Sequence, residues 1–162
     1  MAVHKLLVPG VGGVGKTALT IQLTLKRFYN PIVEDSYRKE TKIDGQACIL
    51  SIIDTGGAEG LPSLSRDQIT NTRAPIMLVG NKTDRVTERE VSTEEGHALA
   101  RELDCEFVEA SAKNGENVEK AILRSARRQW ETFALTRAKA APKGVMVRND
   151  TGGGAATGCV VL

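Results

Sequence analysis

Short apolar runs separated by glycines or polar turns predict the strands of this chain. The clearest is the continuous apolar run 75–79, which ends at Gly80 and is typical of a strand buried on both faces of a sheet. Two other stretches flank Asp44-Gly45, the dipeptide that two-residue turns prefer, and so predict a β-hairpin. The predicted strands are residues 3–8, 36–43, 46–53, 75–79 and 106–108.

Helical spacing of apolar residues predicts three helices between and after these strands. The first includes residues 18–23, and the second begins at Ser92 or Thr93, whose following glutamates are typical of a helix start. The third runs from Asn117 to about residue 135. The residues expected on buried faces are Ala98, Leu99 and Leu103 in the second helix, and Val118, Ile122, Ala126 and Trp130 in the third. Alternating strands and helices predict an α/β fold with a mostly parallel sheet.

The composition changes near residue 137, where Ala, Gly, Thr and Pro begin to dominate without periodicity. Such a segment predicts a flexible tail. A chain of 162 residues is long enough for one buried core. We therefore expect one folded domain over residues 1–136 and a tail over residues 137–162.

Bulk properties exclude several classes of function. A net charge of +2 without a basic stripe argues against nucleic acid as a partner. No apolar run approaches the ~20 residues that a membrane helix requires, and the N-terminus does not read as a secretory signal. Three cysteines are an odd number, which argues against a disulfide framework, and Cys48 and Cys105 are expected to be packed thiols.

A glycine-rich segment between the first strand and the first helix matches the phosphate-binding pattern G-x-x-x-x-G-K-[ST]. Its backbone N–H groups can surround phosphate oxygens at a helix N-terminus. Lys16 can neutralise the β- and γ-phosphates, and the Thr17 hydroxyl can bind Mg²⁺. The residues predicted to hold the phosphates are Gly10, Gly12, Gly13, Val14, Gly15, Lys16, Thr17 and Ala18.

Two polar segments follow predicted strands and are candidates for binding a base. Asn81-Lys82-Thr83-Asp84 follows the run 75–79, and Ser111-Ala112-Lys113 follows the last strand. Ligands of open α/β sheets bind at such strand ends. The Asp84 carboxylate can accept from the ring N–H and exocyclic amine of guanine, a pair of donors that adenine lacks. Sites of this kind can prefer the matching ligand over one that lacks the donors by a factor of ~10⁴.

Together these segments resemble the Ras branch of the small GTPases. Residues 12–28 and 33–39 and the segment Asp54-Thr55-Gly56-Gly57 are similar to that branch, and the resemblance covers most of residues 3–135. It implies a P-loop NTPase G-domain of three layers. It also implies a switch that binds GTP or GDP with Mg²⁺ and hydrolyses GTP to GDP and phosphate. Effector proteins, an exchange factor and a GTPase-activating protein are the partners that such a family implies.

The resemblance also assigns roles to individual residues. Asp54 would hold Mg²⁺ through water, and the Gly57 N–H would contact the γ-phosphate. Phe28 would pack against guanine, Lys82 would lie over the ring, and the Ala112 N–H would contact the base. The base site is completed by Asn81, Asp84, Ser111 and Lys113, and the effector surface would include Val33, Glu34, Asp35, Ser36 and Tyr37.

The last four residues, Cys159-Val160-Val161-Leu162, have the C-a-a-X form. A terminal leucine predicts geranylgeranylation of Cys159 by a prenyltransferase. This predicts attachment through lipid to the cytoplasmic face of the plasma membrane or of an internal membrane. Firm attachment to a membrane through one lipid often needs a second membrane-binding signal. Only the scattered basic residues of the tail could supply that signal.

Two substitutions in this chain predict weak switching and slow hydrolysis. Ile32 stands where the family has the threonine that binds Mg²⁺ and senses the γ-phosphate, and isoleucine has no oxygen to offer. Ala58 stands at the catalytic position where the family has the glutamine that orients the attacking water. The catalytic group would thus be Lys16 and Gly57, without the glutamine.

The interval from Asp54 to Asn81 is 27 positions long, whereas the family fits two strand–helix units there. One such unit takes ~30 residues. We therefore predict that one central strand and the adjoining helices are missing, with the shortening near residues 58–74. Either the strand at 75–79 moves ~4.8 Å into the vacancy, or the sheet keeps a gap whose backbone groups need other partners.

These features favour a membrane-tethered guanine-nucleotide-binding protein, nominally a GTPase, with impaired turnover. The alternative is a non-cycling interaction module, a degraded paralogue or aberrant splice form that presents residues 33–39 to effectors. A P-loop ATPase or small kinase is a third reading, which Asn81-Lys82-x-Asp84 disfavours.

Overall fold

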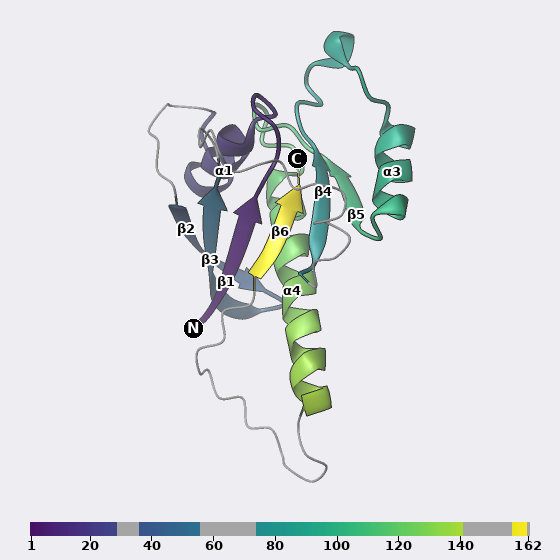
Figure 1. Cartoon of the computed structure of the whole chain (residues 1–162). Coiled ribbons are helices and arrows are strands. Elements are labelled where there is room, and N and C mark those ends of the chain that lie inside the picture. The colour runs from purple at the N-terminus through teal and green to yellow at the C-terminus, as the bar shows by residue number, and fades with distance from the viewer. Residues whose placement is uncertain (29–35, 56–73, 141–156, 162) are drawn as a thin grey trace.

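The computed structural model describes residues 1–28, 36–55, 74–140 and 157–161 of the chain. These residues form a six-stranded sheet with helices packed against it (Figure 1). In chain order the elements are β1 (Ala2–Val8), α1 (Lys16–Leu25), β2 (Ser36–Ile43), β3 (Gln46–Asp54), β4 (Ile76–Gly80), a 3₁₀ turn η1 (Val86–Glu88), α3 (Thr93–Glu102), β5 (Glu106–Glu109), α4 (Val118–Ala140) and β6 (Thr157–Val161). The α/β prediction is therefore confirmed.

The order of the strands across the sheet is β2-β3-β1-β6-β4-β5, and only β2 pairs antiparallel to its neighbour. The predicted hairpin joins β2 to β3. Asp44 and Gly45 both take positive φ, 49° and 80°, as the tight turn between right-twisted strands requires. The predicted strands β1 and β4 also lie where the apolar runs placed them, and the four apolar residues of β4 are all buried.

Neither of the two arrangements predicted for the missing strand is found in the sheet. β4 does not move next to β1, and no gap remains between them, because the C-terminal strand β6 lies between the two and pairs parallel with both (Figure 1). The prediction of a flexible tail therefore does not hold for residues 157–161. Helix α4 also continues to Ala140, beyond the end expected near residue 135.

Helices lie on both faces of the sheet. α1 and α4 contact each other and cover the face that holds the main core. Phe107 and Val108 are neighbours on β5 and so point to opposite faces. Val108 belongs to the main core, whereas the position of a Cβ on Gly96 of α3 would be 2.3 Å from the Phe107 ring. α3 therefore packs on the opposite face, and the three layers are present at this end of the sheet.

The core is made by the buried faces of β1, β3, β4 and the two helices α1 and α4. Its largest fully buried apolar side chains are Leu6, Leu19, Ile21, Leu23, Leu50, Ile52, Met77 and Ile122. The prediction for α4 is confirmed at Val118, Ile122 and Ala126, while the side chain of Trp130 lies outside the described part. Within that part, no helix combines the length and apolar character needed to cross a bilayer.

The buried face of α3 differs from the prediction. Leu103 is buried at the end of the helix as expected, but Ala98 and Leu99 are exposed. The side that faces the sheet is formed by Gly96 and Ala100. The reason is the Phe107 ring, which occupies the space above Gly96 and leaves no room there for a larger side chain.

Candidate functional site

The glycine-rich loop connects the end of β1 at Val8 to the start of α1 at Lys16. Gly13 and Gly15 take positive φ, 81° and 98°, which glycine adopts at no steric cost. Gly15 is the N-cap of α1, and no side chain caps this helix end. The first backbone N–H groups of α1 are therefore open to an anion, which the helix dipole also favours.

Lys16 holds this loop closed over its own backbone. Its ammonium donates to the carbonyl oxygens of Gly10 and Val11, both at 2.9 Å. The side chain is almost completely buried by these contacts. The cation thus lies inside the curve of the loop, where it can neutralise a phosphate that enters.

Asn81, directly after β4, joins the glycine-rich loop to the loop that follows β5. Its Nδ2 donates to the Val14 carbonyl at 3.0 Å, and its Oδ1 accepts from the Ala112 N–H at 3.1 Å. Lys82, which has a left-handed φ of 69°, donates from Nζ to the Gly13 carbonyl. The three predicted segments therefore meet at one edge of the sheet.

Asp84 is held ionised by the second base segment. The buried Ser111 hydroxyl donates to Asp84 Oδ1 at 2.6 Å, and this hydrogen bond lowers the pKa of the Asp84 carboxyl. The charges of Lys113 and Arg85 act in the same direction. Asn114 in turn donates its backbone N–H to the Ser111 hydroxyl oxygen, which fixes the serine. Asp84 is thus an ionised acceptor whose orientation is fixed by Ser111.

Two oxygen donors suited to Mg²⁺ lie near the glycine-rich loop. Asp54 ends β3 and is paired in register with Val8, the last residue of β1. Its side chain is buried, and the next residue, Thr55, donates its hydroxyl to the Val8 carbonyl at 2.9 Å. Thr17 lies in the first turn of α1. Carboxylate and hydroxyl oxygens are ligands that Mg²⁺ accepts, so the donor chemistry fits this ion.

Several predicted residues lie either outside the described part of the chain or away from the contacts above. Gly57, Ala58 and the effector residues Val33, Glu34 and Asp35 lie outside the described residues, as does Ile32. Phe28 is 56% exposed. Ser36 is exposed, but Tyr37 is 6% exposed and belongs to the core. Alternation along β2 turns Tyr37 inward, so it does not contribute to the surface predicted for effectors.

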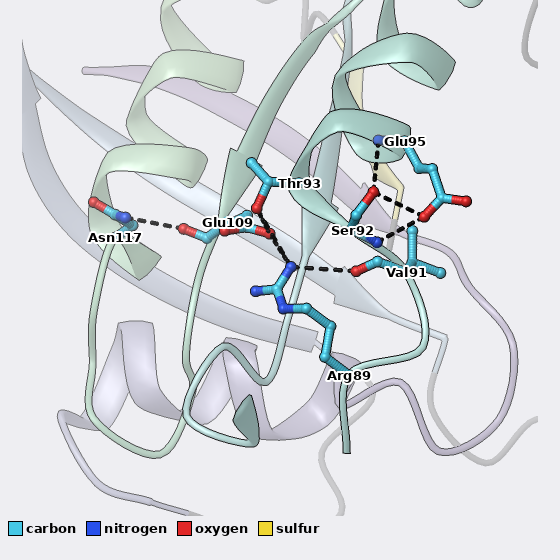
Figure 2. Close-up of polar contacts among 7 residues, drawn as sticks. All are labelled: Arg89, Val91, Ser92, Thr93, Glu95, Glu109 and Asn117. Atoms are coloured by element: carbon cyan, nitrogen blue, oxygen red, sulfur yellow. Dashed lines mark hydrogen bonds and ion pairs between the residues drawn. The ribbon is translucent and has the colours of Figure 1, made fainter. Parts of the chain in front are cut away.

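Sequence reasoning missed a cluster that supports the second base segment (Figure 2). Arg89 Nη1 lies 2.6 Å from Glu109 Oε1, which also accepts from the Thr93 hydroxyl at 3.0 Å. Asn117 donates to the Glu109 carbonyl at 2.9 Å. The partners are far apart in sequence, so no local pattern could reveal them.

This cluster joins the start of α3, the end of β5 and the start of α4. Glu109 is two residues before Ser111, so its contacts restrain the backbone that carries the base segment. The hydrogen bond from Arg89 lowers the pKa of the Glu109 carboxyl, with Thr93 adding to the effect. Ser92 and Glu95 complete the start of α3 with a reciprocal capping box (Figure 2), as the sequence predicted.

Comparison with known proteins agrees with this geometry. The sequence profile of the Ras family matches residues 5–74 and 65–131. The chain is 47% identical to "Ras-like protein 1" of Pyricularia oryzae over 186 aligned positions, which cover 80% of this chain and 77% of the relative. It is 45% identical to "Protein ras-2" of Neurospora crassa, covering 87% and 86%, and 41% identical to "Ras-like protein B" of Aspergillus fumigatus, covering 80% of each.

The length of these alignments bears on the missing strand. An alignment of 186 positions is longer than the whole chain of 162 residues. Positions of the relative must therefore stand opposite gaps in this chain. The profile match also falls into two parts that meet at residues 65–74, within the interval predicted to be shortened.

Proposed function

Since this chain belongs to the Ras family of GTP-hydrolysing signalling proteins, we propose that it binds GTP and GDP with Mg²⁺ but hydrolyses GTP slowly and switches weakly. Binding depends on the glycine-rich loop and the two base segments. Slow turnover follows from Ala58 and Ile32, which lack the groups that orient water and sense the γ-phosphate.

The observation that carries the proposal is the pair of hydrogen bonds made by Asn81. One goes to Val14 of the glycine-rich loop and the other comes from Ala112 of the second base segment. A nucleotide has a phosphate end and a base end, so both halves of its site must keep a fixed separation. These contacts support that separation although β6, a strand from a distant part of the chain, lies between β1 and β4.

Each part of the site has a role in this proposal. Lys16 and the N–H groups at the start of α1 bind the phosphates. Thr17 and Asp54 would hold Mg²⁺, which supplies charge neutralisation at the β- and γ-phosphates when it is bound. Asp84 accepts from guanine, and Ser111 keeps the Asp84 carboxyl ionised and oriented. Lys82, Phe28 and Lys113 would surround the base.

The tail adds a second part to the proposal. Cys159-Val160-Val161-Leu162 has the C-a-a-X form, and we propose that a prenyltransferase attaches a geranylgeranyl group to Cys159. The lipid would then hold the protein at the cytoplasmic face of a membrane.

Fluorescent GDP titration in Mg²⁺ tests nucleotide binding, with GTP and ATP as competitors. We expect GTP and unlabelled GDP to displace the probe and ATP to fail. We also expect Asp84→Ala to remove most of the preference for guanine, which in sites of this kind reaches ~10⁴-fold. Glu131→Ala is the matched control, because it also removes one carboxylate, and Glu131 is exposed on α4 and pairs with Arg127 outside the site.

A chain that binds no nucleotide would contradict the proposal and favour the alternative, a non-cycling interaction module that presents residues 33–39 to effectors. Displacement of the probe by ATP would favour an ATPase instead.

For turnover, Ala58→Gln should raise the rate of single-turnover hydrolysis of bound GTP. If it does not, the missing glutamine is not what limits the rate.

A further inference from the structure

β6 lies in the interior of the sheet, with a partner strand on each side (Figure 1). Toward β1, Thr157, Gly158 and Cys159 pair with Lys5, Leu6 and Leu7. Toward β4, Cys159, Val160 and Val161 pair with Ile76, Met77 and Leu78. Cys159 is thus the residue whose backbone is in register with both neighbours.

The sequence of β6 suits this position. Thr157 and the two valines are β-branched, and residues 159–161 form a continuous apolar run, as is typical of a parallel strand covered on both faces. Without β6, the facing edges of β1 and β4 would have unpaired N–H and C=O groups in the middle of the sheet. Such groups are costly when they are shielded from water. Both the strand and its neighbours therefore favour the paired state.

The same residues form the modification motif. Cys159, Val160 and Val161 are three of the four C-a-a-X residues, and all three lie within β6. Prenylation forms a thioether between Cys159 Sγ and C1 of geranylgeranyl diphosphate. The C1–oxygen bond breaks, diphosphate leaves and the thiol proton goes to solvent. A transferase must surround the tetrapeptide to do this, which it cannot do while β1 and β4 occupy both sides of the strand.

From this overlap we propose that pairing of β6 in the sheet and prenylation of Cys159 are mutually exclusive states of the chain. The folded domain withholds its own C-terminus from the transferase, and the reaction proceeds only through molecules in which β6 has left the sheet. Its rate then follows the population of that open state. This inference rests on the proposed lipid site, and it makes the fold of the domain a control on membrane attachment.

The test compares the full chain with a synthetic peptide of residues 150–162 as substrates of a type I geranylgeranyltransferase. Mass spectrometry follows the addition of the lipid. The peptide has no sheet to pair with, so we expect it to react at least tenfold faster than the full chain. Equal rates would overturn the proposal. A peptide that is not modified at all would remove Cys159 as a lipid site and the proposal with it, whereas nucleotide binding would stand.

A pair of variants separates strand pairing from recognition by the transferase. Gly158→Pro removes a backbone N–H from the interior of β6 and leaves the tetrapeptide unchanged. Gly158→Ala keeps that N–H. We expect the proline variant of the full chain to react at a rate near that of its own peptide, and the alanine variant to stay slow. Peptides with the same two substitutions correct for any preference of the enzyme, and equal rates for the two full-length variants would overturn the proposal.

Hydrogen exchange provides a readout that does not depend on the transferase. In the unmodified chain, the amides of residues 157–161 should exchange slowly, and in the geranylgeranylated chain they should exchange at the rate of the free peptide. The β2–β3 hairpin should stay protected in both forms and in Gly158→Pro, which shows that the domain has not unfolded. Unprotected amides in β6 of the unmodified chain would overturn the proposal.

Discussion

Asn81 packs so closely on Gly15 that a Cβ at Gly15 would stand 2.4 Å from Asn81 Nδ2. The same amide nitrogen donates to the carbonyl of Val14, the residue before Gly15. The glycine therefore serves two purposes. It adopts the positive φ that ends the phosphate loop, and it lets the base segment approach the backbone of that loop.

Gly15→Ala should weaken both folding and nucleotide binding. The left-handed φ of 98° costs a residue with a side chain about 1–3 kcal/mol, and the new methyl group would displace Asn81. We expect a lower melting temperature without nucleotide and a weaker affinity for GDP. Gly12→Ala is the control for the melting temperature alone, because nothing lies within 4 Å of its Cβ position. Equal melting temperatures for the two variants would contradict this account.

The Arg89–Glu109 contact gives a second prediction. The two side chains are only 34% and 27% exposed, and Glu109 also accepts from Thr93. Arg89→Ala should lower the melting temperature slightly, because Glu109 would keep its partly buried position and lose its cation. Because Glu109 precedes the second base segment, GDP should also dissociate faster.

Arg127→Ala is the matched control for this effect. Arg127 pairs with Asp44 and with Glu131 four residues away, and all three side chains are more than half exposed. Its loss should change neither the melting temperature nor GDP dissociation measurably. If the two arginine variants behave alike, the Arg89 cluster does not position the base segment.

Sequence patterns predicted those parts of the fold and site that depend on neighbouring residues. The phosphate loop, the Asp44-Gly45 turn and the capping box at Ser92 each need residues only a few positions apart. The buried run of β4 was equally clear. In each case the chemistry of a short segment determines its conformation.

The parts that were missed depend on contacts between distant segments. β6 forms a strand because β1 and β4 leave room for one between them. β1 lies more than a hundred residues before β6 in the sequence, and β4 lies about eighty residues before it. The apolar run 159–161 follows a glycine-rich stretch, and its sequence does not indicate which strands it pairs with. Similarly, Gly96 faces the sheet because the Phe107 ring lies against it. The spacing of apolar residues does not predict this buried face, because glycine is not one of the residues it uses.

His4 predicts how stability depends on pH. It is buried in β1, and burial lowers its pKa below 6.5, although a hydrogen bond with Gln129 opposes the shift. The unfolded chain therefore binds a proton at this position at higher pH than the folded chain does. Its contribution to stability is present above pH 6.5 and is lost as the pH falls through and below that value.

Thermal melts between pH 7.5 and pH 5.5 check this prediction. The melting temperature should fall with pH, and His4→Val should reduce the slope. An unchanged slope in His4→Val would mean that another group controls the dependence.

Nucleotide binding and the pairing of β6 should strengthen each other. β1 leads into the phosphate loop, β4 leads into Asn81, and β6 is the strand that connects β1 to β4. A nucleotide that contacts both ends of its site favours the aligned sheet, and by linkage the paired strand favours the nucleotide.

GDP with Mg²⁺ at one hundred times its Kd should stabilise the native state by about 2.7 kcal/mol. It should also slow hydrogen exchange in β6 and prenylation of Cys159. Geranylgeranylated chain should bind GDP more weakly than unmodified chain. Equal GDP affinities for the two forms, measured in the same detergent, would show that β6 and the nucleotide site are not coupled.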